Sequence, residues 1–116
     1  MNKRVRAILK EPIKFLKWCE ALNLARWYEQ RLVEIYQRDR PKKDKLSLMR
    51  GLVLSFEGKG IFFDFHLEPP AGSRMHIEEF DTRRHQIAER ARKSLRELLR
   101  TMRCTGEQIS CRGEQA

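Results

Sequence analysis

Long apolar runs are missing from this chain of 116 residues. A membrane-spanning helix needs about 20 consecutive apolar residues, and no segment approaches that length. The basic start of the chain is followed by only Ala7, Ile8 and Leu9 before Lys10, which is too short for the core of a signal peptide. The two absences together predict a cytoplasmic protein that has no membrane partner.

Cysteine is also scarce. Cys19, Cys104 and Cys111 are odd in number and form no C-x-x-C pair. A disulfide framework is therefore not expected, and this usage favours a reducing compartment. Cys19 shares one side of a predicted helix with Phe15 and Leu16, so we expect it to be a small core residue rather than a nucleophile.

Catalytic motifs are absent as well. There is no glycine-rich phosphate loop, and no serine or cysteine has an identifiable base. Asp64, His66 and His76 have side chains that could hold a divalent metal and serve a nuclease, but their spacing matches no specific motif. We therefore predict a protein that is not an enzyme and has no catalytic residues, metal site or cofactor. A metal-dependent nuclease remains an alternative.

Acidic residues are in deficit. The chain has 25 Lys and Arg against 16 Asp and Glu, a net charge of +9 and an isoelectric point near 9.9. Residues 1–45 carry a net charge of +7 and residues 82–116 carry +5, whereas residues 46–81 carry −3. Such a charge favours affinity for polyanions but says nothing about the fold.

Residues 46–67 alternate between apolar and polar side chains and predict an antiparallel β-hairpin. Gly58 and Lys59 suit the two central positions of a type II′ turn, which pairs Phe56 with Ile61 across the strands. Every large apolar residue then meets another. The two apolar strand faces consist of Leu46, Leu48, Leu52, Leu54 and Phe56, and of Ile61, Phe63, Phe65 and Leu67.

Helical periodicity flanks this hairpin. Helices are expected over residues 12–22, 24–38 and 82–103, the first starting at Pro12 and the last capped by Asp81. A third short strand is possible over residues 75–78.

The chain length suits a single domain. We place one domain at residues 1–104 and expect residues 105–116 to form a disordered C-terminal tail. Both tryptophans, Trp18 and Trp27, are expected in the core.

The predicted fold class is α+β, with two N-terminal helices, a central antiparallel β-hairpin and a long C-terminal amphipathic helix. This order of elements resembles that of winged-helix regulators that dimerise through their last helix, with Asn23 at the turn of a helix-turn-helix. Glu29, however, stands where the second helix usually has an apolar residue, and the hairpin is more apolar than an exposed wing. Helices on one face of a small sheet are therefore preferred.

The last predicted helix carries the strongest functional signal. Its apolar side is opposed by a stripe of cations, and arginine has a planar fork that suits phosphate oxygens. Lysines in the preceding charged loop add to the predicted nucleic-acid-binding set. That set is Arg92, Lys93, Arg96, Arg100 and Arg103, with Lys42, Lys43 and Lys45.

Two functions follow from this pattern. The first is a small basic regulator that binds DNA or RNA through phosphate contacts without reading sequence. The alternative is a protein-binding modulator or inhibitor, of the mobile-element type, which docks on an acidic protein surface or adds its hairpin edge to a partner's sheet. A homodimer is a further option, because an apolar hairpin is rarely stable when it is uncovered.

Overall fold

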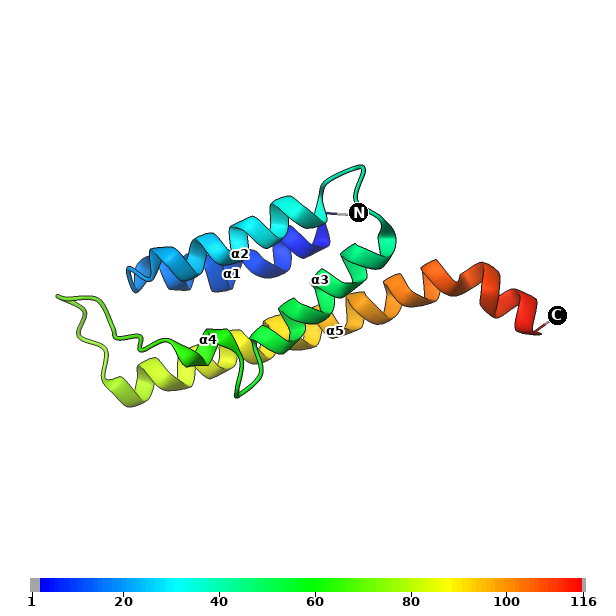
Figure 1. The fold of residues 1–116 in the computed structure, drawn as a ribbon. Coiled ribbons are helices and arrows are strands. Elements are labelled where there is room, and N and C mark those ends of the chain that lie inside the picture. Colours follow the sequence, from blue (N-terminus) through cyan, green and yellow to red (C-terminus); the bar gives the residue numbers. More distant parts are fainter. Residues whose placement is uncertain (1–2, 116) are drawn as a thin grey trace.

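The fold is all-helical. The computed structural model describes the backbone of residues 3–115 and the side chains of residues 3–102. No strand occurs in that backbone, so the predicted α+β class, its central hairpin and its third strand are wrong. The resemblance to winged-helix regulators is not supported either, because the wing of those proteins is a β-hairpin. The elements are α1 (Arg4–Trp18), α2 (Leu22–Ile35), α3 (Lys42–Ser55), α4 (Ile61–Asp64) and α5 (Ile77–Gln115) (Figure 1).

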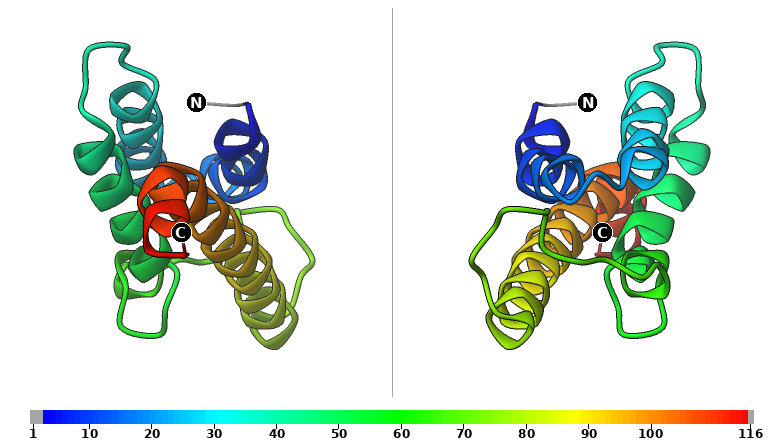
Figure 2. Two further views of the ribbon diagram at one scale, coloured as in Figure 1. Left: turned by 90° about the vertical axis from the view of Figure 1, so that its right-hand side faces the viewer. Right: turned by 90° about the vertical axis from the view of Figure 1, so that its left-hand side faces the viewer.

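The four longer helices form an up-and-down bundle. Helix α1 packs against α2 and α5, and α3 packs against the same two helices. Successive long helices run in opposite directions, so α5 is antiparallel to both α1 and α3 (Figure 1). The end views in Figure 2 show α1 and α3 on either side of α5. Helix α5 therefore has one flank toward α1, one toward α3 and a remaining side toward solvent.

The first predicted strand is instead the helix α3, because its apolar residues also fit a helical period. Met49, Leu52, Val53 and Phe56 follow one another at spacings of three, one and three residues, and all four are buried. Leu54, which the hairpin would have buried, is 59% exposed. Leucine, methionine and lysine favour helices, and only one residue of α3 is β-branched.

The second predicted strand is split between the single turn of α4 and an extended connection to α5. Phe62, which the hairpin placed on its mixed face, is completely buried, whereas Phe65 is 46% exposed. The residues between α3 and α4 form a turn in which the Gly60 N–H donates to the Glu57 carbonyl at 2.8 Å. The glycines thus join two helices rather than two strands.

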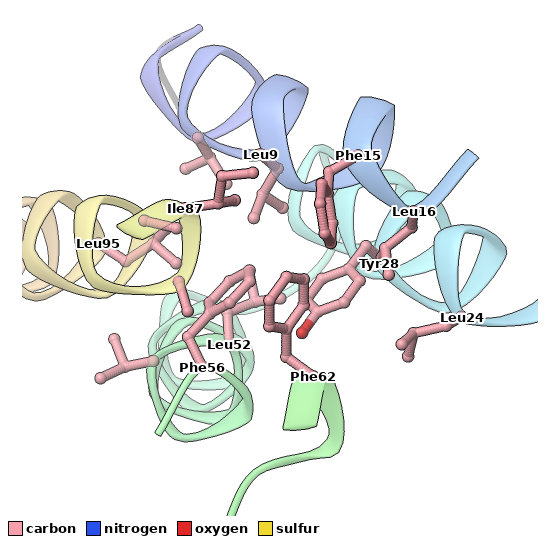
Figure 3. Packing of buried hydrophobic residues seen from close by; sticks show 14 of the residues in the cluster. Leu9, Phe15, Leu16, Leu24, Tyr28, Leu52, Phe56, Phe62, Ile87 and Leu95 are labelled. Carbon is pink, nitrogen blue, oxygen red and sulfur yellow. The ribbon is translucent and has the colours of Figure 1, made fainter. Parts of the chain in front are cut away.

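Aromatic rings from α1, α2, α4 and α5 meet in the core with Phe56, the residue directly after α3. The Phe62 ring lies 5.1 Å from that of Phe56, 6.2 Å from that of Phe15 and 6.4 Å from that of Tyr28, centre to centre (Figure 3). Phe15 in turn packs on Phe80 of α5 at 5.3 Å. Four other helices are therefore tied to one another around the short helix α4.

One buried polar pair lies inside this core. The Tyr28 hydroxyl donates to Ser55 Oγ at 2.9 Å, and that hydroxyl donates to the Leu52 carbonyl at 2.6 Å. Burial raises the pKa of Tyr28 well above its ordinary value. The pair satisfies both hydroxyls and links α2 to the last turn of α3.

All three predicted helix starts differ from the structure. Helix α2 begins at Leu22 rather than at residue 24, so Asn23, which the winged-helix resemblance placed at a turn, lies inside the helix. Helix α1 begins at Arg4, because Val5 and Leu9 continue the buried side of Pro12 and Leu16 backwards, and Pro12 lies inside the helix. Helix α5 begins before Asp81, which is therefore not a cap.

The expected extent of the domain and of the tail stays a prediction. The backbone of α5 continues to Gln115, while the side chains from residue 103 onward lie outside the described part of the chain.

Two glycine substitutions distinguish the helical fold from the hairpin. A Cβ on Gly60 would clash with the Leu54 carbonyl oxygen, whereas one on Gly58 would meet nothing within 4 Å. We expect Gly60→Ala to lower the free energy of unfolding by roughly 1–3 kcal/mol through this clash. We expect Gly58→Ala to leave it nearly unchanged, because Gly58 does not have a positive φ.

Urea denaturation followed by far-UV circular dichroism measures both variants. A type II′ hairpin would give the reverse order, since its first turn position needs a positive φ and residue 60 would lie in a strand. Greater damage from Gly58→Ala than from Gly60→Ala would contradict the helical arrangement.

Candidate nucleic-acid interface

The predicted cations of α5 lie on the side of the helix that faces away from the core. The apolar side of α5 is buried between α1 and α3. On the opposite side Lys93, Arg96 and Arg100 are exposed to solvent, and Arg92 is half-buried. The buried apolar residues of this helix are Phe80, Ile87, Ala88, Ala91, Leu95, Leu98 and Leu99. Arg103 belongs to the same predicted stripe, but its side chain lies outside the described residues.

One glutamate neutralises the first half of the stripe. Arg92 Nη2 donates to the Glu89 carboxylate at 2.9 Å, and Lys93 Nζ lies 3.8 Å from the same carboxylate. The hydrogen bond from Arg92 lowers the pKa of Glu89, and the same bond raises the pKa of Arg92. Arg92, whose side chain is 22% exposed, is thus less available than Lys93, Arg96 and Arg100 of the same helix.

Arg96 and Arg100 are different. Both are exposed, and neither has a hydrogen bond or ion pair with any side chain of residues 3–102. They are four residues apart, which places them one above the other on consecutive turns of α5. These two arginines keep their full hydrogen-bonding capacity for a ligand.

The three predicted lysines occupy the first turn of α3. Lys42 and Lys43 are exposed and Lys45 is half-buried, and none of them has an ion-pair partner among the described side chains. Cations are unfavourable at this end of a helix, because the backbone dipole is already positive there. The first turn of α3 therefore has an excess of positive charge, which Asp44 in the same turn offsets in part.

The sequence prediction missed Arg50. It lies seven residues after Lys43, hence on the same side of α3, and it is exposed without an ion-pair partner in the described chain. Helical spacing would have revealed this relation, but the strand interpretation concealed it.

Helix α3 packs antiparallel on α5, so residues before Glu57 run alongside the part of α5 that follows Arg92 (Figure 1). Glu57, just after α3, lines the same small cavity as Glu89 and Arg92 of α5. Going back from Glu57 along α3 therefore leads in the direction of the C-terminal half of α5. We call the set Lys43, Arg50, Arg96 and Arg100 the α3–α5 face.

The acidic and imidazole residues considered for metal binding are not gathered. Asp64 is the last residue of α4, and His76 directly precedes α5. His66 lies in the exposed connection between them, with its Nε2 2.9 Å from Glu68 Oε1. Within residues 3–102, no cluster of three or more His, Cys, Asp or Glu side chains could hold a metal ion. The nuclease alternative gains no support from this arrangement.

Another cation, Arg84, serves the fold. It is 8% exposed, and its Nη2 donates to the carbonyls of Phe62 and Phe65 at 2.7 and 2.8 Å. The guanidinium also lies over the Phe63 ring at 5.2 Å, and burial lowers its pKa. Arg84 thereby attaches α4 to α5 and satisfies carbonyl groups that end α4.

Replacing Arg84 should weaken the fold far more than replacing its neighbour. Arg84→Met leaves two carbonyl groups without a donor, and we expect a loss of roughly 2–3 kcal/mol in the free energy of unfolding. Arg83→Met is the matched control, with an expected loss below about 1 kcal/mol because Arg83 is exposed and its guanidinium lies over the Trp18 ring without replacing a buried hydrogen bond. Equal losses in urea denaturation would show that Arg84 does not hold α4.

Cys19 is half-buried at the turn after α1. Burial raises the pKa of its thiol to about 11, an effect that Arg84 and Arg83 partly oppose. The thiolate is therefore rare at neutral pH, which makes Cys19 a poor nucleophile, as its apolar position predicts.

A pH series of alkylation tests this thiol. In a Cys104→Ser, Cys111→Ser background, the rate with iodoacetamide should rise about tenfold per pH unit up to about pH 10 without levelling, because only the thiolate reacts. The same chain in urea should level off above about pH 9, near the ordinary thiol pKa. A plateau near neutral pH in the folded protein would identify an activated cysteine instead.

Comparisons with protein-family models, with curated proteins and with solved structures return no match. Within the described part of the chain, no helix is both long and apolar enough to cross a bilayer. The chemistry of this protein is therefore inferred from the cations and rings on its own surface.

Proposed function

We propose that this protein is a small, non-enzymatic regulator that binds nucleic acid through the phosphate backbone. The observation that carries the proposal is the α3–α5 face, on which Lys43, Arg50, Arg96 and Arg100 are exposed and form no hydrogen bond or close ion pair with an acidic side chain among the described residues, although Arg96 lies within coulombic range of Glu89. Four unpaired cations on two adjacent helices form a surface that a polyanion would neutralise.

The geometry of α5 suits a phosphate backbone. Arg96 and Arg100 are separated by about 6 Å of helix rise, so their side chains can reach successive phosphates of one strand. Each guanidinium can donate two parallel hydrogen bonds to one phosphate. Such contacts fix a protein on nucleic acid without reading its sequence.

The charge distribution adds an energetic argument. The lysines at the start of α3 oppose the dipole of their own helix, and the net charge of +9 resists compaction. A bound polyanion would relieve both effects and release condensed counterions. Binding of a polyanion at the α3–α5 face should therefore also raise the free energy of unfolding.

The alternative of a protein-binding modulator is narrowed by the fold. Docking by a hairpin edge is not proposed, because no strand exists in residues 3–115. The reason for expecting a homodimer no longer holds, since there is no hairpin among the described residues and its supposed apolar residues, except Leu54 and Phe65, are at least partly buried in the bundle. An acidic protein surface remains the competing ligand for the α3–α5 face.

A charge-matched pair of variants tests the proposal. The face variant replaces Lys43, Arg50, Arg96 and Arg100 by Ala, and we expect it to bind labelled duplex DNA and single-stranded RNA at least tenfold more weakly at physiological salt. Its plot of log affinity against log salt should also be shallower by about 0.9 for each duplex phosphate that the variant no longer neutralises.

The control variant removes the same charge elsewhere. It carries Ala at four other exposed cations, Arg26, Arg38, Lys59 and Arg74. We expect its affinity to fall less than about threefold, because only the long-range field has changed. Equal weakening of the two variants would contradict the proposal that the α3–α5 face binds nucleic acid. Binding by the parent that vanishes at physiological salt would contradict it too.

A further inference from the structure

A second basic region lies on the other flank of α5, where that helix packs against α1. A groove of about 510 Å³ opens there between the two helices. Its walls combine cations with aromatic and aliphatic side chains, whereas the α3–α5 face consists of cations. The lining residues are Ala7, Lys10, Glu11, Lys14, Phe15, Trp18, Arg83 and Ile87.

Trp18 is the unusual element of this groove. Its residue is 37% exposed, although the sequence predicted a core position. One part of the ring is held by Phe80, stacked at 6.1 Å, and by Phe15, tilted at 5.9 Å. The ring is therefore fixed in orientation while a large part of it faces solvent.

The charges around Trp18 are almost entirely positive. Lys10 and Lys14 are exposed, lie one helical turn apart on α1 and have no ion-pair partner among the described side chains. The only acid in the groove, Glu11, is already engaged by Arg90, whose Nη2 lies 2.8 Å from its carboxylate. The groove thus presents free cations and no free carboxylate.

Arg83 completes the arrangement. Its guanidinium carbon lies 5.5 Å from the centre of the Trp18 ring. A guanidinium beside an exposed indole offers a stacking surface and a phosphate donor together. Proteins that bind single strands combine these two elements, because an unpaired base has a free face and its backbone carries charge.

We infer that the α1–α5 groove holds an unpaired nucleotide of a single-stranded nucleic acid, with its base against Trp18 and its flanking phosphates at Lys10 and Lys14. This inference rests on the proposed function and specifies its ligand. In a duplex the bases are stacked on one another and cannot enter the groove, whereas the phosphates can still reach the α3–α5 face. The volume of the groove lies in the range of small-ligand sites.

The fluorescence of Trp18 reports directly on this site. In a Trp27→Phe background Trp18 is the only tryptophan, so its emission can be followed without interference. We expect a single-stranded oligonucleotide to quench it saturably at physiological salt, and a duplex of equal length to bind without comparable quenching. A mononucleotide should quench only at much higher concentration, because it lacks the phosphates on either side.

Substitutions separate stacking from charge. Trp18→Leu should weaken single-strand binding about tenfold and leave duplex binding unchanged, while Trp18→Phe should retain most of the affinity because a ring remains. Lys10→Ala with Lys14→Ala should weaken single-strand binding more than the control pair Arg26→Ala with Arg38→Ala. If Trp18→Leu fails to fold by circular dichroism, the Trp18→Phe variant and the quenching titration still decide.

The outcomes keep the two proposals apart. Duplex binding that depends on the α3–α5 face, without quenching of Trp18 by single strands, would overturn this inference and leave the proposed function standing. Absence of binding to either nucleic acid would overturn both. Quenching by a polyglutamate peptide as strong as that by the oligonucleotide would also overturn the inference, because the groove would then accept an acidic protein segment.

Discussion

The packing of Phe62 is the interaction on which the rest of this structure depends. Its ring is completely buried and lies within 6.4 Å of rings from α1, from α2 and from Phe56 directly after α3. The neighbouring Phe63 packs on His85 of α5. Helix α4, a single turn too short to be stable alone, is held by this burial and by Arg84. Buried aromatic rings prefer a few offset or tilted arrangements, so the cluster restricts how the four long helices can rotate.

The rotation of α5 in turn decides which of its cations can meet a ligand. With Phe80, Ile87 and Leu95 inside, Arg84 must point toward α4, and burial makes it a structural residue. The same rotation turns Arg83 toward Trp18 on the α1 flank and Arg96 toward solvent. A single packing constraint therefore produces two basic regions of different character, one with an aromatic platform and one without.

The sequence predicted the amphipathic character of α5 but not the path of residues 46–67. There the apolar residues fit two periods at once, since Leu52 and Phe56 belong to the inner side of either a strand or a helix. The distinction rested on Met49, Val53 and Phe62, which a hairpin leaves on its mixed face and which the bundle buries. The alternation of apolar and polar residues favoured a strand, but the apolar residues on the second face of that strand were evidence for a helical period. The burial of these residues in the bundle outweighed the turn preference of Gly58.

The candidate sites were predictable only in part. Whether a cation on one helix is free to bind a ligand depends on which acidic side chains pair with it and on which helices cover it. Residue type and spacing identified Arg92 and Arg96 alike, yet Glu89 accepts a hydrogen bond from the first and none from the second. The ion pair between Glu11 and Arg90 joins residues 79 positions apart. No local sequence pattern could reveal that this pair neutralises the acidic residue that lines the α1–α5 groove. Trp18 is exposed for the same reason: α5 covers one part of its ring through Phe80 and leaves the rest open. The proposed preference for unpaired nucleotides therefore arises from the packing of α1 on α5 and not from the composition of either helix.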